Sequence, residues 1–364
     1  MSHGTAASHL TFSLALHRAV ATGAADSCFS PYSVASALGL VARAARGKAA
    51  DELLALLGDD FDARPLREAA TLEPRPDREE PVLAVANTLW VWDQLPIEPG
   101  YAGELATWPG GRVAEAPFVT EPERARQVIN ADIAETTRGL IPELLPPGIV
   151  GDDTVASVVN ALYLRCPWAI PFSDGATGPA AFAAPSGVRE VPTMHQSERL
   201  AYHADGGWQV VGMPAVGGAE AVVLLPDGEL AGQEAALDAE ALAALLDGLR
   251  PRQVNLALPK LDLDVRADLT GALQHLGVRT LFGPGADLSG LSPDPRLVVS
   301  DVLHQSVLRV DESGFEGAAA TAAMMRLTSM PIDEVSVSVD RPFLLLVRHA
   351  ATGVVYFFAR VVEP

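Results

Sequence analysis

The feature that most constrains this chain is a segment of small residues between two strand-like stretches near the C-terminus. Residues Asp311–Pro331 read DESGFEGAAATAAMMRLTSMP, and no side chain from Gly317 to Ala323 is larger than that of threonine. Long loops without structure of their own are uncommon in compact domains and are usually functional. Small side chains also fit into a packed space where larger ones would clash. We therefore expect this segment to have a function of its own.

The composition is that of a globular protein with a strongly acidic surface. The chain has 364 residues, 49% of them apolar, and a net charge of -20. This charge argues against nucleic acid or an anionic membrane as the main partner. No apolar run approaches the roughly eighteen residues that a membrane span requires. The N-terminus lacks the basic region and the unbroken apolar core of a signal peptide, which predicts an amphipathic first helix and a soluble, cytoplasmic protein.

Helical patterns dominate the first part of the chain and strand patterns the rest. Apolar spacing predicts helices over 33–45, 48–57 and 121–138, with one early strand over 82–92. Later strands are predicted over 155–164, 221–225, 254–265, 297–310, 335–339, 343–347 and 354–362, with a bulge or bend at Pro259. Residues 64–81 are loop-like. Helices followed by strands, without regular alternation, indicate an α+β fold.

Signatures of catalysis and metal binding are weak. The sequence contains no GxSxG, no HExxH and no phosphate loop ending in GK[ST]. The two cysteines, Cys28 and Cys166, have neither metal-site nor disulfide spacing. His195 and His203 could share a metal, but such a site would lack carboxylate or thiol support. They are therefore interpreted as surface histidines. His304 lies within a strand pattern, which favours a hydrogen-bonded core residue over a catalytic base. We therefore predict no enzyme, no metal and no cofactor.

Several polar residues stand where structural roles are expected. Ser30, Pro31 and Ser33 begin a predicted helix, and serine is a good cap for the free amides there. Asn87 and Asn160 lie within apolar strands, where polar side chains need partners. These two residues suggest a hydrogen-bond network beneath a sheet.

From end to end the chain resembles the serpin family, and its bacterial-type members in particular. The motifs that carry the likeness are DSCFSPYS at 26–33 with AARGKA at 44–49, ANTL at 86–89, IN at 129–130 with Thr137, Gly139 and Ile141, VNALY at 159–163 with Trp168 and PF at 171–172, LPD at 225–227, LPK at 258–260, ADLSGLS at 286–292, His304, and RPF at 341–343. Departures from the family pattern include Asp26, Ala49, Asp132 and Cys166. Each motif alone is weak, and their common order and spacing is specific.

The resemblance implies one domain over 1–364, built from three β-sheets and about eight or nine helices, with an exposed reactive loop at about 311–334. Members of the family are bait substrates. A serine protease, or sometimes a cysteine protease, cleaves the loop, and the N-terminal part of the loop enters the largest sheet as a new strand. The trapped acyl-enzyme is distorted before it is hydrolysed. The resemblance thus implies a monomeric suicide inhibitor, in a family that often acts outside cells.

The same resemblance assigns parts of the loop. Glu312 begins the hinge, Gly314 is its pivot, and the strand that enters is Gly317–Ala323, so the hinge comprises Glu312, Gly314, Phe315, Gly317, Ala318, Ala319, Ala320 and Thr321. The family's usual interval places the reactive bond at Thr328–Ser329. Arg326–Leu327 and Met330–Pro331 stay open as alternatives. An Arg326 bait predicts trypsin-like targets, and a Thr328 bait predicts elastase-like or subtilisin-like ones.

Two structural clusters also follow from the resemblance. Lys260 and Glu312 correspond to an ion pair where the sheet first opens, and Trp168 covers it. A central polar cluster, which controls how easily the middle strands part, corresponds to Ser30, Ser33, Asn160 and His304.

Phe315 departs from the family at the residue that enters the sheet first, where relatives usually carry Thr or Ser. We expect the larger ring to overpack the gap by roughly 1 to 3 kcal/mol. A penalty of about 1.4 kcal/mol at the first step slows insertion about tenfold. Phe315 therefore favours cleavage over trapping, and it motivates a second hypothesis of a non-inhibitory binding or carrier protein.

Overall fold

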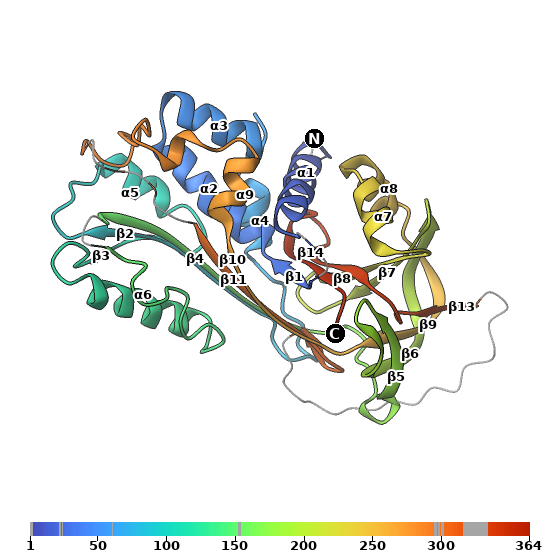
Figure 1. Ribbon diagram of the computed structural model, residues 1–364. Helices are drawn as coiled ribbons and strands as arrows, with labels where there is room; N and C mark the ends of the chain where they lie inside the picture. The colour runs from blue at the N-terminus through green and yellow to red at the C-terminus, as the bar shows by residue number, and fades with distance from the viewer. Residues whose placement is uncertain are drawn as a thin grey trace.

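The computed structural model describes residues 3–21, 23, 25–59, 61–151, 154–294, 297, 299, 302–315 and 334–364 (Figure 1). Within these residues the α-helices are α1 His3–Val20, α2 Pro31–Ala44, α3 Gly47–Leu57, α4 Arg64–Ala69, α5 Pro99–Leu105, α6 Pro122–Thr136, α7 Leu230–Ala236, α8 Ala239–Asp247 and α9 Leu269–His275. The strands are β1 Ser27–Phe29, β2 Val82–Trp92, β3 Gly111–Ala116, β4 Ala156–Pro167, β5 Gly178–Ala184, β6 Gly187–Asp205, β7 Trp208–Pro214, β8 Ala219–Pro226, β9 Arg250–Pro259, β10 Leu261–Asp268, β11 Leu303–Val310, β12 Gly314–Phe315, β13 Glu334–Ser338, β14 Phe343–His349 and β15 Val355–Val361.

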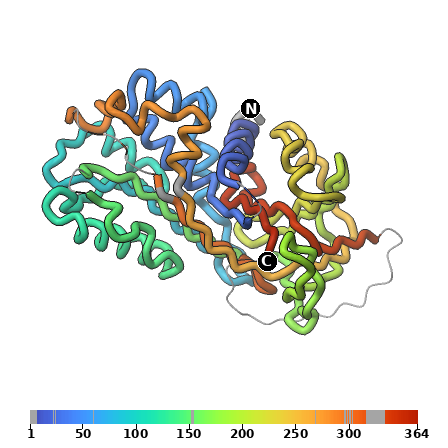
Figure 2. The backbone as a smooth tube through the Cα atoms, in the orientation of Figure 1, coloured from blue at the N-terminus to red at the C-terminus, as the bar shows by residue number. Residues whose placement is uncertain are grey.

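A six-stranded sheet has the order β10-β11-β12-β4-β2-β3. Strands β2 and β4 form a long antiparallel ladder, from Val82 opposite Arg165 to Val91 opposite Ala156. Strands β10 and β11 form a second antiparallel ladder. The two ladders lie side by side (Figure 2), and the two-residue strand β12 is the element that pairs with both. The centre of this sheet is therefore its least complete part.

Strand β4 presents different side chains to the two faces of this sheet. Leu164 and Cys166 are buried in the large core that includes α2. Val159 and Ala161 are buried in a smaller core with α6. Figure 1 shows α2 and α6 on opposite sides of the sheet. Side chains alternate between the two faces along a strand. The register of a strand paired with β4 therefore determines which of the two cores each of its side chains faces.

A nine-stranded sheet forms the other half of the molecule, with the order β1-β15-β14-β8-β7-β6-β9-β13 and with β5 paired to β6. The long strand β6 pairs with β5 over 187–193, with β9 over 193–202 and with β7 over 201–205. It thereby joins two of the three sheets that the resemblance implies. The predicted burial of residues 343–347 on both faces is confirmed, because all five are at most 1% exposed.

The predicted α+β class is confirmed, and some local predictions need correction. The loop-like stretch 64–81 contains α4, which has a proline in its first turn, a position that proline tolerates well. The predicted strand 254–265 is two strands, β9 and β10, which break at Lys260 and belong to different sheets. Pro259 marks this bend, as expected. Among the described helices none is both long and apolar enough to cross a membrane.

Candidate functional site

The hinge begins with a tight turn between β11 and β12. One carboxylate oxygen of Asp311 accepts hydrogen bonds from the amides of Ser313 and Gly314 and from the Ser313 hydroxyl. The Asp311 amide donates to the Gly314 carbonyl at 3.0 Å. Aspartate favours such turns because its side chain bonds to nearby backbone amides. The turn reverses the chain, so that β12 runs antiparallel to β11.

Strand β12 lies between β11 and β4. Phe315 is opposite Val310 on one side and Cys166 on the other, and Gly314 is opposite Pro167. A Cβ atom on Gly314 would lie 2.2 Å from the carbonyl oxygen of Cys166, so only glycine fits there. We call the boundary between β4 and β11, in line with β12, the slot. Gly314 and Phe315 already occupy the end of the slot next to the Asp311 turn.

The Phe315 ring is accommodated in the slot. It is 1% exposed and packs edge-to-face on Trp168, with ring centroids 5.0 Å apart and an interplanar angle of 88°. Aromatic pairs favour this geometry. The Trp168 indole in turn donates to the Asp311 carbonyl at 2.8 Å. The expected overpacking assumed a gap sized for threonine, whereas the Phe315 ring has Trp168 as an edge-to-face partner.

Glu312 is held by two side chains at the mouth of the slot. Lys260 Nζ lies 2.7 Å from Glu312 Oε2, and the Thr177 hydroxyl donates to Oε1 at 2.7 Å. Burial alone would raise the pKa of Glu312, but the hydrogen bonds from Lys260 and Thr177 outweigh it and lower that pKa. The ion pair is partly solvated, with Lys260 40% exposed. The structure thus brings Lys260, Glu312 and Trp168 to one end of the sheet.

His304 lies in the middle of the slot, on the β11 side. Its Nε2 accepts a hydrogen bond from the Ser30 amide at 2.9 Å and contacts the Ser306 hydroxyl at 2.9 Å. Ser30 also caps α2, because its hydroxyl accepts from the Ser33 amide. Burial lowers the pKa of His304 to about 4, so the ring is neutral. Ser30, Ser33 and His304 are therefore linked, as the resemblance implied.

Asn160 is not bonded to that group. It lies on β4, across the slot from His304, and its Nδ2 donates to Asn87 Oδ1 at 2.5 Å. Asn87 is 1% exposed and donates in turn to the Pro109 carbonyl. The buried Oδ1 of Asn160 has no hydrogen-bond partner among the described residues. The expected four-residue cluster is thus divided by the slot, because the β2–β4 ladder places Asn87 directly opposite Asn160.

The remaining predicted residues fall into two groups. His195 and His203 are eight residues apart on β6, which separates them by about 26 Å, so they do not share a site. Among the described residues no cluster of three potential ligands is suited to a metal. The other loop positions lie outside the described residues: Gly317, Ala318, Ala319, Ala320, Thr321, Arg326, Leu327, Thr328, Ser329, Met330 and Pro331.

Sequence reasoning missed three contributors to this site: Asp311, Thr177 and Ser306. Asp311 was detectable, because Asp two residues before a Ser-Gly pair is a common turn signal. Thr177 and Ser306 carried no such signal, because their roles depend on contacts between distant parts of the chain.

Comparison with known proteins gives this arrangement a family. The sequence model of the serpin family, described as serine protease inhibitor, matches residues 5–364. The chain belongs to the serpin family. Serpin-Z2A of Oryza sativa subsp. japonica is 33% identical over 388 aligned residues, which cover 92% of this serpin and 91% of the relative. The leukocyte elastase inhibitor of Bos taurus is 32% identical over 348 residues, covering 92% of each chain.

Solved structures show the same fold. Thyroxine-binding globulin in complex with thyroxine matches this serpin with a TM-score of 0.86 and 25% identity, over 100% of both chains. Relatives of this serpin therefore include both a protein named for inhibiting a protease and a protein named for binding a small molecule. The family alone does not choose between these functions.

Proposed function

We propose that this serpin inhibits serine endopeptidases as a suicide substrate. The observation that carries the proposal is β12, a strand that pairs with β4 through Gly314 and Phe315 and with β11 through Phe315 before any cleavage. A strand that continues β12 through the slot gains about ten backbone hydrogen bonds, each worth about 0.5–1.5 kcal/mol. Insertion is then favourable once cleavage frees the loop.

The chemistry uses the protease's own nucleophile. The serine hydroxyl of the protease attacks the carbonyl carbon of Thr328, the peptide bond to Ser329 breaks, and the new amine leaves with a proton. The protease stays attached to Thr328 as an ester. Gly317–Ala323 then enters the slot and draws the ester with it. The protease is distorted before water can hydrolyse that ester.

The described residues have distinct roles in this proposal. The Lys260–Glu312 pair and the Trp168 ring hold the mouth of the slot until cleavage, which the 2.7 Å contact and the buried Phe315–Trp168 packing support. Farther along, His304 and Asn160 face each other across the path of the entering strand. His304 is bonded to the Ser30 amide, and Asn160 is bonded to Asn87 on the neighbouring strand. The two strands can therefore separate without loss of these hydrogen bonds.

The test is incubation with trypsin-like, elastase-like and subtilisin-like proteases. We expect a complex with one class that survives SDS, and a separate peptide 329–364 identified by mass spectrometry after the complex is denatured. A released peptide that begins at Leu327 or Pro331 would move the bait to Arg326 or Met330. Cleavage of the loop by all three classes, with no stable complex, would overturn inhibition.

A matched variant separates trapping from cleavage. Gly314→Val places side-chain atoms against the Cys166 carbonyl and prevents β12 from forming. We expect this variant to be cleaved at the same bond without a stable complex. Gly228→Ala is the control, because a Cβ there meets nothing within 4 Å. If both variants trap protease equally, β12 does not matter for inhibition.

A non-inhibitory binding or carrier function is the second candidate, favoured by Phe315 in place of the usual Thr or Ser and by the likeness to thyroxine-binding globulin. Its signature is a loop that does not insert. If the melting temperature is the same before and after loop cleavage, this second function replaces the first.

A further inference from the structure

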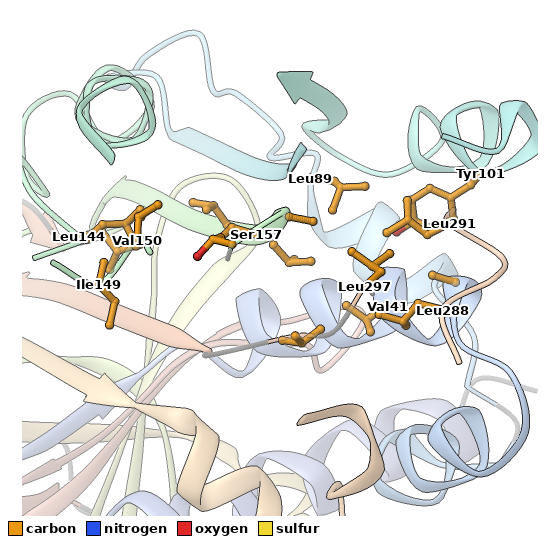
Figure 3. A pocket seen from close by; sticks show the side chains of 17 residues that line it. Val41, Leu89, Tyr101, Leu144, Ile149, Val150, Ser157, Leu288, Leu291 and Leu297 are labelled. Carbon is orange, nitrogen blue, oxygen red and sulfur yellow. The ribbon is translucent and has the colours of Figure 1, made fainter. Parts of the chain in front are cut away.

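The apolar cavity beside Ser157 of β4 is too small for a ligand. In Figure 3, Leu144 and Ile149 lie on one side of Ser157, and Val41 and Leu288 lie on the other. The cavity holds about 60 Å³, whereas sites for drug-sized ligands enclose about 300–1,000 Å³. A second concave region, on the outer face of β6, β9 and β13, holds about 480 Å³. We call this region the hollow.

The hollow lies where three neighbouring strands present two rows of mostly small, polar side chains. The first row is His195, Ala257 and Ser338, and the second row is Ser197, Asn255 and Ser336. Leu256 and Val337, which lie between the rows in sequence, are 1% and 2% exposed. Because side chains alternate between the two faces of a strand, both rows point away from the core. The hollow is thus a shallow depression in an open sheet face, unlike the enclosed apolar pockets that bind small molecules.

The face around the hollow is nearly neutral, although the chain as a whole carries a net charge of -20. Among the described residues that line the hollow none is a carboxylate. The next row along the three strands carries Arg199, Gln253 and Glu334, whose two charges are opposite. The polar groups of the hollow are hydroxyls, amides and an imidazole, all of which can donate hydrogen bonds. A partner side chain that accepts hydrogen bonds, a carboxylate included, is therefore repelled less here than over the acidic surface at large.

Strand β13 places this face close to the predicted reactive bond. It is the last strand in the order of its sheet, and its first residue, Glu334, follows Ser329 by five positions. Five residues span at most about 18 Å when fully extended. A globular enzyme of about 230 residues has a radius of about 20 Å. A protease that holds the bond Thr328–Ser329 is therefore wide enough to cover the hollow as well.

We propose that the outer face of β6, β9 and β13 is a second contact surface for the body of the target protease. This inference rests on the proposed function, since it takes the protease as the partner. The hollow receives a protease side chain that accepts hydrogen bonds from Asn255 and from the serine hydroxyls. Among proteases that cut the same bond, the contact favours those whose surface fits the hollow. It forms before the bond is cut, so it changes the rate of complex formation and not the later competition between trapping and hydrolysis.

Filling the hollow tests this contact with trypsin-like, elastase-like and subtilisin-like proteases. Ser336 is exposed, and an aromatic residue is well tolerated in a strand. We expect Ser336→Phe to lower the second-order rate constant of SDS-stable complex formation about tenfold, the effect of losing one good interface contact. The number of inhibitor molecules consumed per protease trapped should stay the same. Asn255→Ala, which removes a donor without filling the hollow, should lower the same rate constant about threefold.

The control is Ala106→Phe, which adds the same ring to an exposed site after α5, at the other end of the molecule from β13 (Figure 1). It should keep the wild-type rate constant. Equal rate constants in the wild type, Ser336→Phe and Asn255→Ala would overturn the inference and leave the proposed function standing. A wild-type dimer in sedimentation that Ser336→Phe converts to a monomer, with an unchanged rate constant, would assign the face to a second copy of the chain and overturn the inference as well.

The rate of loop cleavage separates this inference from the proposed function. If no protease forms a stable complex, suicide inhibition fails, but cleavage of the loop by the same proteases is still measured below saturation. Slower cleavage of Ser336→Phe than of Ala106→Phe would then support the contact surface. Equal cleavage of the two variants would overturn it, whatever the outcome for trapping.

Discussion

The two sheets of this serpin differ at their centres. In the nine-stranded sheet, β14 pairs along most of its length with β8 on one side and β15 on the other. In the six-stranded sheet, the equivalent middle position holds β12, which has two residues. Both centres are equally buried, since Leu345 of β14 and Phe315 of β12 are each 1% exposed. Burial alone therefore does not distinguish a finished sheet from one that has room for another strand.

The difference lies in what each buried residue can do when it is disturbed. A side chain in β14 or β15 leaves its place only when the whole sheet unfolds. Phe315 belongs to β12, a strand of two residues, and can leave its place without the rest of the sheet. Substitutions in the two sheets should therefore lower the free energy of unfolding by different amounts, even where the side chains are equally exposed.

The largest effect is expected in the finished sheet. Phe358 of β15 is fully buried and stacks on His17, with ring centroids 4.2 Å apart. Phe358→Ala should lower the free energy of unfolding by about 3–5 kcal/mol, because it removes a large ring from a site that cannot collapse. Urea denaturation of the intact protein measures this. Val188→Ala is the control, because Val188 is 76% exposed and should show no change.

The second effect compares one histidine near each sheet, of which His304 is buried and His9 is partly buried. His304 is in the slot, and His9 of α1 accepts from the Val355 amide of β15. Burial lowers the pKa of each to about 4. Below about pH 6.5 the unfolded chain takes up a proton that the native ring refuses, so stability falls as pH falls from 6.5 towards 4.

Each histidine should cost about 2 kcal/mol of stability between pH 7 and pH 5. His304→Asn and His9→Asn should each reduce the slope of unfolding free energy against pH. Urea midpoints at a series of pH values measure the slope, whatever the absolute stability of each variant. An unchanged slope in either variant would mean that the corresponding ring takes up its proton in the native state as readily as in the unfolded chain.

The third effect concerns Phe315. Phe315→Thr should lower the stability of the intact protein by about 1–2 kcal/mol, less than a core phenylalanine, because the hinge can undock and limit the loss. If about 1 kcal/mol of docking energy is lost at the first step, insertion slows up to about fivefold. More inhibitor molecules should then be consumed per protease trapped, as measured by titration. A lower consumption would restore the overpacking argument.

The comparison also shows what sequence could and could not predict. The family motifs led to the fold and placed Lys260, Glu312, Trp168 and His304 at one sheet. The division between Asn160 and His304 was not predictable, because it depends on the register of β4 against β2. The contact between Phe315 and Trp168 was not predictable either. The two residues are 147 positions apart in the chain, and their edge-to-face packing arises only in the folded structure. Local sequence patterns predict helices and strands, whereas contacts between distant strands depend on how those elements pack together.

The smallest effect is expected at the mouth of the slot. Lys260→Met removes the ion pair with Glu312, but the loss is limited to about 0.5–1 kcal/mol, because Lys260 is 40% exposed and Glu312 keeps its bond from Thr177. The matched control is Arg124→Met on α6, whose pair with Glu121 is 66% and 54% exposed and should contribute less. Urea midpoints of the intact proteins compare the two. A difference between them would show that an ion pair at the incomplete centre holds the slot shut, whereas equal midpoints would mean that Phe315 and Trp168 close it without help from charge.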